Sequence, residues 1–130
     1  MKVSLGRVIL LVEDYDKAFD FYRRNFFCKK LYDAVMPDGQ RYVHIGFSDN
    51  TTVGLWLLKA DDATQSERIG HQTGGQPTIV IYTDNCEDLY HYVKTNTVEI
   101  IEGLTVTPES KFFHCKDLYG NRLTVVEVLH

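Results

Sequence analysis

The same order of predicted elements occurs twice along the chain. In each half, a strand rich in β-branched residues leads into a segment with apolar residues at helical spacing, and three more strand-like segments follow. Aligning the two helical segments sets Val12 against Thr83 (83 − 12 = 71), and aligning the last strands sets Val53 against Asn121 (121 − 53 = 68). Because the two offsets are nearly equal, we predict a structural repeat of two βαβββ modules.

The first module is predicted over residues 1–59 and the second over residues 77–130, joined by a linker over residues 60–76. The linker is polar and shows no pattern that predicts an element, so it is either a plain crossover or a loop that closes over a site by hinging at Gly74 and Gly75.

In the first module the predicted elements are a strand over 6–12, a helix over 13–26 and strands over 28–36, 41–47 and 53–59, with a turn over 48–52. In the second module they are a strand over 78–83, a helix over 84–96 and strands over 98–106 (broken near Gly103), 111–116 and 122–128.

Composition limits the class of protein. A chain of 130 residues with 44% hydrophobic residues is long and apolar enough to bury the core of one domain. No apolar run approaches the roughly 20 residues that a membrane span needs, and the acidic residues after the first strand do not fit a signal peptide, so a cytoplasmic protein without a membrane partner is expected. The net charge of −4 and the scattered basic residues argue against nucleic acid as a partner.

The three cysteines, Cys28, Cys86 and Cys115, lie far apart and form no C-x-x-C motif. That spacing fits neither a zinc knuckle nor a redox-active pair, and we expect reduced thiols that pack as small hydrophobic side chains.

Three stretches carry a resemblance to a known family. "VEDYDKAFDFYRRNF" is similar to a V-x-D-x-x-x-A-x-x-FY opening, "QTGGQPTIVIYTDNC" to the start of a second module, and "KDLYGNRLTVVEV" to a closing strand with a D-P-D/Y-G-N turn. Together they resemble the vicinal oxygen chelate superfamily, which includes glyoxalase I, fosfomycin and bleomycin resistance proteins and extradiol dioxygenases. The resemblance covers essentially the whole chain. It implies a single α+β domain over residues 1–130, with two βαβββ modules forming a curved mixed-sheet cup, and a homodimer.

In that family a metal sits among four strand positions that usually carry His, Gln or Glu. Carried onto this sequence, the resemblance places them at Arg7, Trp56, Thr78 and Thr124. Arginine and tryptophan offer no lone pair, and neutral threonine hydroxyls are poor ligands beside imidazole or carboxylate. We therefore expect no metal and no other cofactor; a divalent metal would require a different register of ligands.

The same strands supply candidate ligand-binding residues. Alternation along a strand places every second side chain on one face, so residues of one parity would line the cup and select a planar or hydrophobic anion. Competing interpretations are that Arg7 reaches to water, that Trp56 is ordinary core, and that Tyr42 and His44 face solvent instead. The candidates are Arg7, His44, Trp56, Thr78, Tyr82, His114 and Thr124.

Three functions compete at this stage. The first is a metal-independent protein of the glyoxalase/bleomycin-resistance kind that binds a small organic molecule, anionic or aromatic, in the cup. The alternative is a lyase, isomerase or dioxygenase with a non-standard site, in which His44, His114 or Tyr82 supplies acid–base chemistry. A structural or regulatory dimer without a ligand ranks third, and whether the chain is an enzyme at all stays open.

Metal content separates the first two. Protein purified without a His-tag, soaked separately in nickel, zinc, manganese or ferrous iron and then desalted, is expected to retain less than about a tenth of an equivalent of each metal, because the four positions offer no good ligand. Plasma mass spectrometry measures the ratio. A value close to one metal per chain would show that the ligand positions were assigned wrongly.

Overall fold

A computed structural model describes residues 1–47 and 53–130. The turn predicted over residues 48–52 lies outside the described residues. The chain divides into two compact units, Met1–Ile69 and Gly70–His130, each of which is considered by itself below.

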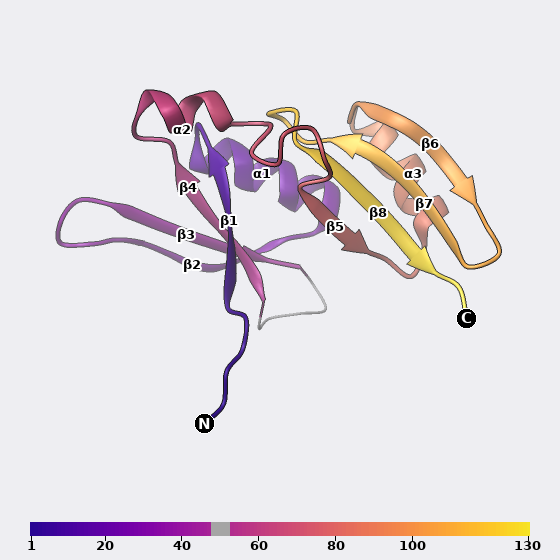
Figure 1. Cartoon of the computed structure of the whole chain (residues 1–130), viewed down its shortest axis with the longest axis horizontal. Coiled ribbons are helices and arrows are strands. Elements are labelled where there is room, and N and C mark those ends of the chain that lie inside the picture. Colours follow the sequence, from indigo (N-terminus) through magenta and orange to yellow (C-terminus); the bar gives the residue numbers. More distant parts are fainter. Residues whose placement is uncertain (48–52) are drawn as a thin grey trace. The chain divides into compact units, whose positions relative to one another are not determined.

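The first unit is a four-stranded sheet with one long helix (Figure 1). The strands lie in the order β1-β4-β3-β2, with β1 parallel to β4 and the other neighbours antiparallel. This is the predicted βαβββ module. Its elements are β1 (Arg7–Val12), α1 (Tyr15–Phe26), β2 (Lys29–Val35), β3 (Arg41–Gly46), β4 (Gly54–Lys59) and a short helix α2 (Ala63–Arg68).

Helix α1 covers one face of this sheet. Asp14 caps it as expected, accepting a hydrogen bond from the backbone nitrogen of Lys17 at 3.0 Å, and its i, i+4 positions Ala18 and Tyr22 are fully buried. The buried strand residues alternate with half-buried or exposed ones, so one face of the sheet packs under the helix. The buried residues of that face are Leu10, Val12, Val43, Ile45, Leu55 and Leu57.

The second unit repeats the topology. Its strands lie in the order β5-β8-β7-β6, again with the first strand parallel to the last, and α3 lies behind β7 in the view of Figure 1. Ile9 pairs with Trp56 in the first sheet as Val80 pairs with Thr124 in the second, which confirms the register predicted for the repeat. The elements are β5 (Ile79–Tyr82), α3 (Cys86–Thr95), β6 (Ile100–Val106), β7 (Ser110–Lys116) and β8 (Arg122–Val128).

Both sheets contain a bulge at the equivalent place. In β2 the register shifts between Lys30 and Tyr32, and in β6 it shifts between Ile100 and Glu102. A second shift, between Glu102 and Thr105, flanks Gly103, where the sequence predicted a break. Each first bulge inserts one extra residue, which changes the face on which the following side chains stand.

The linker is not free of regular structure, which corrects the sequence-based expectation. Helix α2 occupies its first half, capped by Asp62, whose side chain accepts from the backbone nitrogen of Gln65 at 2.7 Å. None of its six residues is buried, so it lacks the apolar stripe from which a helix is predicted. Within the described residues, none of the helices has the length and apolar character to cross a membrane.

Gly54 allows a close approach between β3 and β4. A Cβ there would collide with the backbone oxygen of Ile45 and would lie 2.8 Å from Cδ1 of Leu31. Gly54→Ala is therefore expected to destabilise the protein by about 1–3 kcal/mol, since a backbone atom cannot move aside cheaply. Urea unfolding measures the loss, and Gly6→Ala, where an added Cβ has open space, is the matched control. Equal stability of the two variants would contradict this packing.

An ion-pair network joins α1 to the β2–β3 hairpin. Arg41 donates to Asp33 and to Asp16, both at 2.9 Å, and Lys30 donates to Asp33 at 2.7 Å. Hydrogen bonds from Arg41 and Lys30 lower the pKa of Asp33 below its ordinary value of 3.8. A lowered pKa in the folded state means that the network adds stability above the unfolded pKa and loses it as the pH falls through the folded value.

Asp33→Asn is accordingly expected to cost about 0.5–1 kcal/mol at pH 7, the range of partly exposed ion pairs, and less at pH 3. Urea unfolding at the two pH values tests the difference. Asp38→Asn, in the turn of the same hairpin, removes the same charge but keeps an oxygen that accepts from the backbone of Gln40. A penalty that is independent of pH, or shared by the control, would rule out the network as its source.

Candidate functional site

The face of the first sheet opposite α1, here called the open face, carries an aromatic cluster. The cluster consists of Tyr32, Tyr42, His44 and Trp56. The ring centroids of His44 and Trp56 lie 4.8 Å apart, those of Tyr42 and Trp56 5.4 Å, and those of Tyr32 and His44 5.7 Å. These separations are typical of interacting aromatic pairs. Strand pairing produces the row, because Tyr32 lies opposite His44 and His44 lies opposite Trp56.

Arg7 joins this cluster from the start of β1. Its Nε donates to Nδ1 of His44 at 3.2 Å, and its Nη1 donates to the carbonyl oxygen of Gly6 at 2.8 Å. Burial, and then the charge of Arg7, lower the pKa of His44 below its ordinary value. The imidazole is therefore neutral at pH 7 and stands beside a fixed positive charge.

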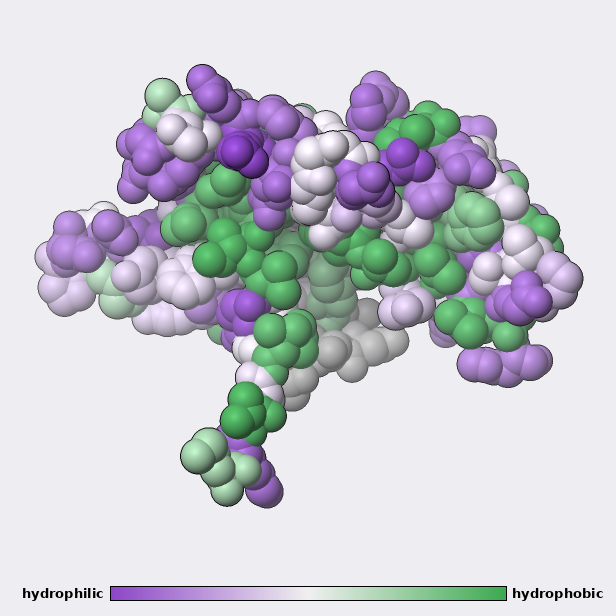
Figure 2. Space-filling view, in the orientation of Figure 1, coloured by the Kyte–Doolittle hydropathy of each residue, from purple (hydrophilic) through white to green (hydrophobic). Residues whose placement is uncertain are grey.

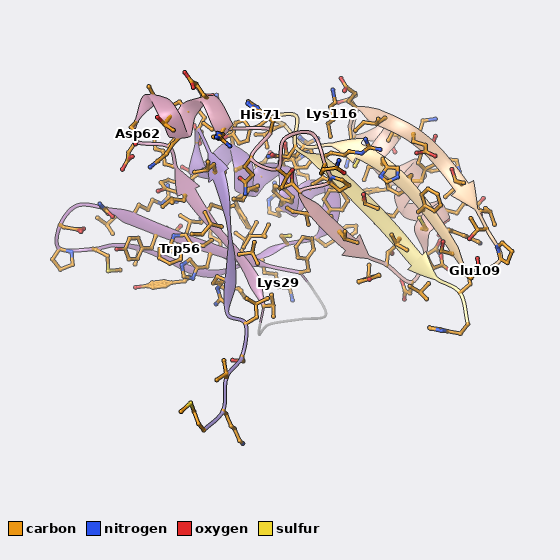
Figure 3. The ribbon with its side chains drawn as sticks, viewed as in Figure 1. Lys29, Trp56, Asp62, His71, Glu109 and Lys116 are labelled. Atoms are coloured by element: carbon orange, nitrogen blue, oxygen red, sulfur yellow. The ribbon has the colours of Figure 1, made fainter. Side chains whose placement is uncertain are left out.

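Aliphatic side chains continue the open face along β1. Ile9, two residues after Arg7 on the same strand, is 45% exposed and pairs with Trp56. Figure 2 shows hydrophobic surface over β1 and β4, and Figure 3 labels Trp56 on this sheet. The open face thus combines apolar area, a row of tilted aromatic rings and the guanidinium group of Arg7.

The equivalent face of the second sheet, opposite α3, is called the open face of that sheet and is more polar. Nδ1 of His114 lies 2.9 Å from the Thr124 hydroxyl, and its Nε2 lies 3.6 Å from Oε2 of Glu102. Burial and the charge of Arg122 lower the pKa of His114, and Glu102 opposes them. Phe112 packs its ring edge to face against His114, with centroids 5.6 Å apart.

The structure brings the predicted residues together in two groups. Arg7, His44 and Trp56 meet in the first unit, and His114 and Thr124 meet in the second. The hydroxyl of Thr78 lies 3.1 Å from that of Thr73, and Tyr82 is 74% exposed on β5. That all seven line one cup stays a prediction.

Tyr32 and Glu102 were not among the residues predicted from the sequence. Tyr32 lies directly opposite His44, and Glu102 lies directly opposite His114, each just after a bulge. Strict alternation along "KKLYDAV" would have set Tyr32 under the helix, opposite Val43. Nothing in the residue pattern signals the inserted residue, so this part of the face could not be predicted.

The four positions at which the family resemblance implies metal ligands do not fit a divalent cation. The guanidinium of Arg7 and the indole of Trp56 have no lone pair to offer a metal. The hydroxyls of Thr78 and Thr124 are neutral oxygens that already form hydrogen bonds with Thr73 and His114, respectively. No group of three or more His, Cys, Asp or Glu side chains with the spacing of a metal site occurs in the part of the chain that the structure describes.

The three cysteines are free and buried, as expected from their spacing. Burial raises the pKa of the Cys28 and Cys115 thiols to about 12 and that of Cys86 to about 11. Since the thiolate is the reactive form, these values argue against a nucleophilic role for any of them.

Comparison with known proteins agrees with this fold. An uncharacterised protein of Shewanella frigidimarina (strain NCIMB 400) is 27% identical over 122 residues, which cover 93% of this chain and 90% of that protein. The crystal structure of UcmS2 superposes with a TM-score of 0.82 at 21% identity, covering 97% of this chain and 98% of that one. The structure of TnmS3, an antibiotic binding protein from Streptomyces sp. CB03234, gives a TM-score of 0.80 at 20% identity, with 99% of both chains covered.

The family model described as Glyoxalase/Bleomycin resistance protein/Dioxygenase superfamily matches residues 4–125. That range includes every strand and helix from β1 to β7 and more than half of the final strand. The α+β fold and the repeated strand order of the two sheets agree with it, and the chain belongs to the glyoxalase/bleomycin resistance protein/dioxygenase superfamily.

Proposed function

We propose that this protein binds a planar aromatic anion on the open face of its first sheet, without a metal. The observation that carries the proposal is the contact of Arg7 with His44, whose ring packs at a tilt against that of Trp56. A cation next to an aromatic row is complementary to a ligand with a flat ring and a negative group.

Stacking supplies the first part of the affinity. An aromatic ring placed against Trp56 or Tyr42 gains about 0.5–1.5 kcal/mol per pair beyond the area that it buries. Ile9 adds exposed aliphatic surface on the same face. The positive charge of Arg7 adds selectivity, because a guanidinium favours carboxylate or phosphate over neutral groups.

Two further observations support binding rather than catalysis. The residues at the expected metal positions do not suit a divalent cation, and the thiols have raised pKa values. TnmS3, a protein of the same fold, is an antibiotic binding protein, so the fold accommodates a function of this class. The homodimer and the cytoplasmic location stay predictions from the sequence.

The single tryptophan makes the proposal directly testable. Its indole Nε1–H gives one cross-peak in a ¹⁵N-labelled sample, which reports on the open face without optical interference. Titration with 2-naphthoate, 2-naphthylmethanol and cyclohexanecarboxylate separates the effects of ring and charge. We expect 2-naphthoate to shift the peak at the lowest concentration.

Arg7→Met is expected to weaken 2-naphthoate binding about 10- to 100-fold, as the loss of a charged partner predicts, and to change 2-naphthylmethanol binding little. Arg24→Met removes the same charge from the exposed surface of α1 and is the control. If none of the three compounds shifts the peak, or if all three bind equally before and after Arg7→Met, the proposal is wrong.

A further inference from the structure

The hydrogen bond from Arg7 fixes where the proton of His44 resides. A guanidinium group can only donate, so Nδ1 of His44, 3.2 Å from Nε of Arg7, must accept. In a neutral imidazole the other nitrogen then carries the hydrogen. His44 therefore presents an Nε2–H donor, and Arg7 acts as the positioning residue that selects this tautomer.

A second donor stands beside it. His44 and Trp56 are directly opposite each other on β3 and β4, so their side chains project from the same face. Nε2 of His44 and Nε1 of Trp56 are both shielded from solvent, and neither has a hydrogen-bond partner within the described residues. Buried donors of this kind are normally satisfied, and leaving two of them together without an acceptor is costly.

The second unit provides an internal comparison. His114 occupies the position equivalent to His44, opposite Thr124 as His44 is opposite Trp56. There Nδ1 lies within hydrogen-bonding distance of the Thr124 hydroxyl, and Nε2 faces the carboxylate of Glu102. Both nitrogens of His114 thus have polar partners, and an unmatched donor on the histidine is a property of the first unit.

We propose that His44 and Trp56 form a subsite for an oxygen acceptor of the ligand, a carboxylate or ring carbonyl oxygen carried by a planar aromatic compound. This inference rests on the proposed function and names the ligand atom that the open face recognises. Both rings are half-buried, and the subsite requires each side chain to rotate so that its N–H faces the ligand. The oxygen accepts from Nε2–H and Nε1–H, while the aromatic ring stacks on the cluster.

The tautomer is tested without any ligand. Long-range ¹H–¹⁵N correlation of the histidine rings is expected to show His44 protonated on Nε2 and unprotonated on Nδ1 at pH 7. Arg7→Met should release this preference, while Arg24→Met should leave it unchanged. A wild-type His44 protonated on Nδ1 would overturn the inference.

The subsite is tested with two probes that share a ring system, 2-naphthoate and naphthalene, the second of which has no acceptor. His44→Phe and Trp56→Phe each keep a ring and remove one N–H donor. Each is expected to weaken 2-naphthoate binding about tenfold more than it weakens naphthalene binding, because only 2-naphthoate loses a hydrogen bond. The affinity is followed by calorimetry, and binding of 2-naphthoate to the wild type should also move the Trp56 Nε1–H resonance downfield. His91→Phe, on α3, is the matched control.

The outcomes separate this inference from the function beneath it. If the wild type binds both probes and the two variants weaken them equally, the rings matter and the donors do not, so the subsite is wrong while aromatic binding stands. An indole resonance that does not move downfield on binding would likewise overturn the subsite alone. If the wild type binds neither probe, the proposed function fails and the subsite with it.

Discussion

The strands of both sheets have two unlike faces, and the rest of the molecule depends on burying one of them against a helix. In the first unit, Leu10, Val43 and Leu57 lie on three adjacent strands and are almost completely buried on the side of α1. A slip of one residue would expose all of them, so this packing fixes the register of the sheet. Once the register is fixed, the residues that alternate with the buried ones all project from the open face.

The open faces of the two units show how one scaffold gives different chemistry. Equivalent histidines occupy both, yet one is held by a guanidinium donor and the other by a hydroxyl and a carboxylate. The first arrangement selects a single tautomer and leaves two donors without an acceptor in the described part of the chain, whereas the second places a polar partner near each ring nitrogen. The first face also carries the apolar and aromatic surface that a flat ligand requires. The difference lies in a few side chains on the same strand positions.

Much of this was predictable because it depends on local pattern. The repeat, the order of strands and helices and the cap at Asp14 all follow from alternation and helical spacing. The family followed from short motifs at the ends of the modules and is confirmed by a match over residues 4–125. Helix α2 was missed because none of its residues is buried, and a helix without an apolar stripe has no periodic signal.

The sequence by itself determined the two-module fold and which residues have the chemistry to bind an anion or to disfavour a metal, because residue type and spacing are enough for both. Only the tertiary structure decided which of them meet. The bulge at Leu31 turns Tyr32 onto the open face, and the bond from Arg7, made by residues 37 positions apart, selects the tautomer of His44. Both depend on the pairing of strands that are distant in sequence, and the spacing of residues along one strand carries no signal of an inserted residue or of a partner on another strand.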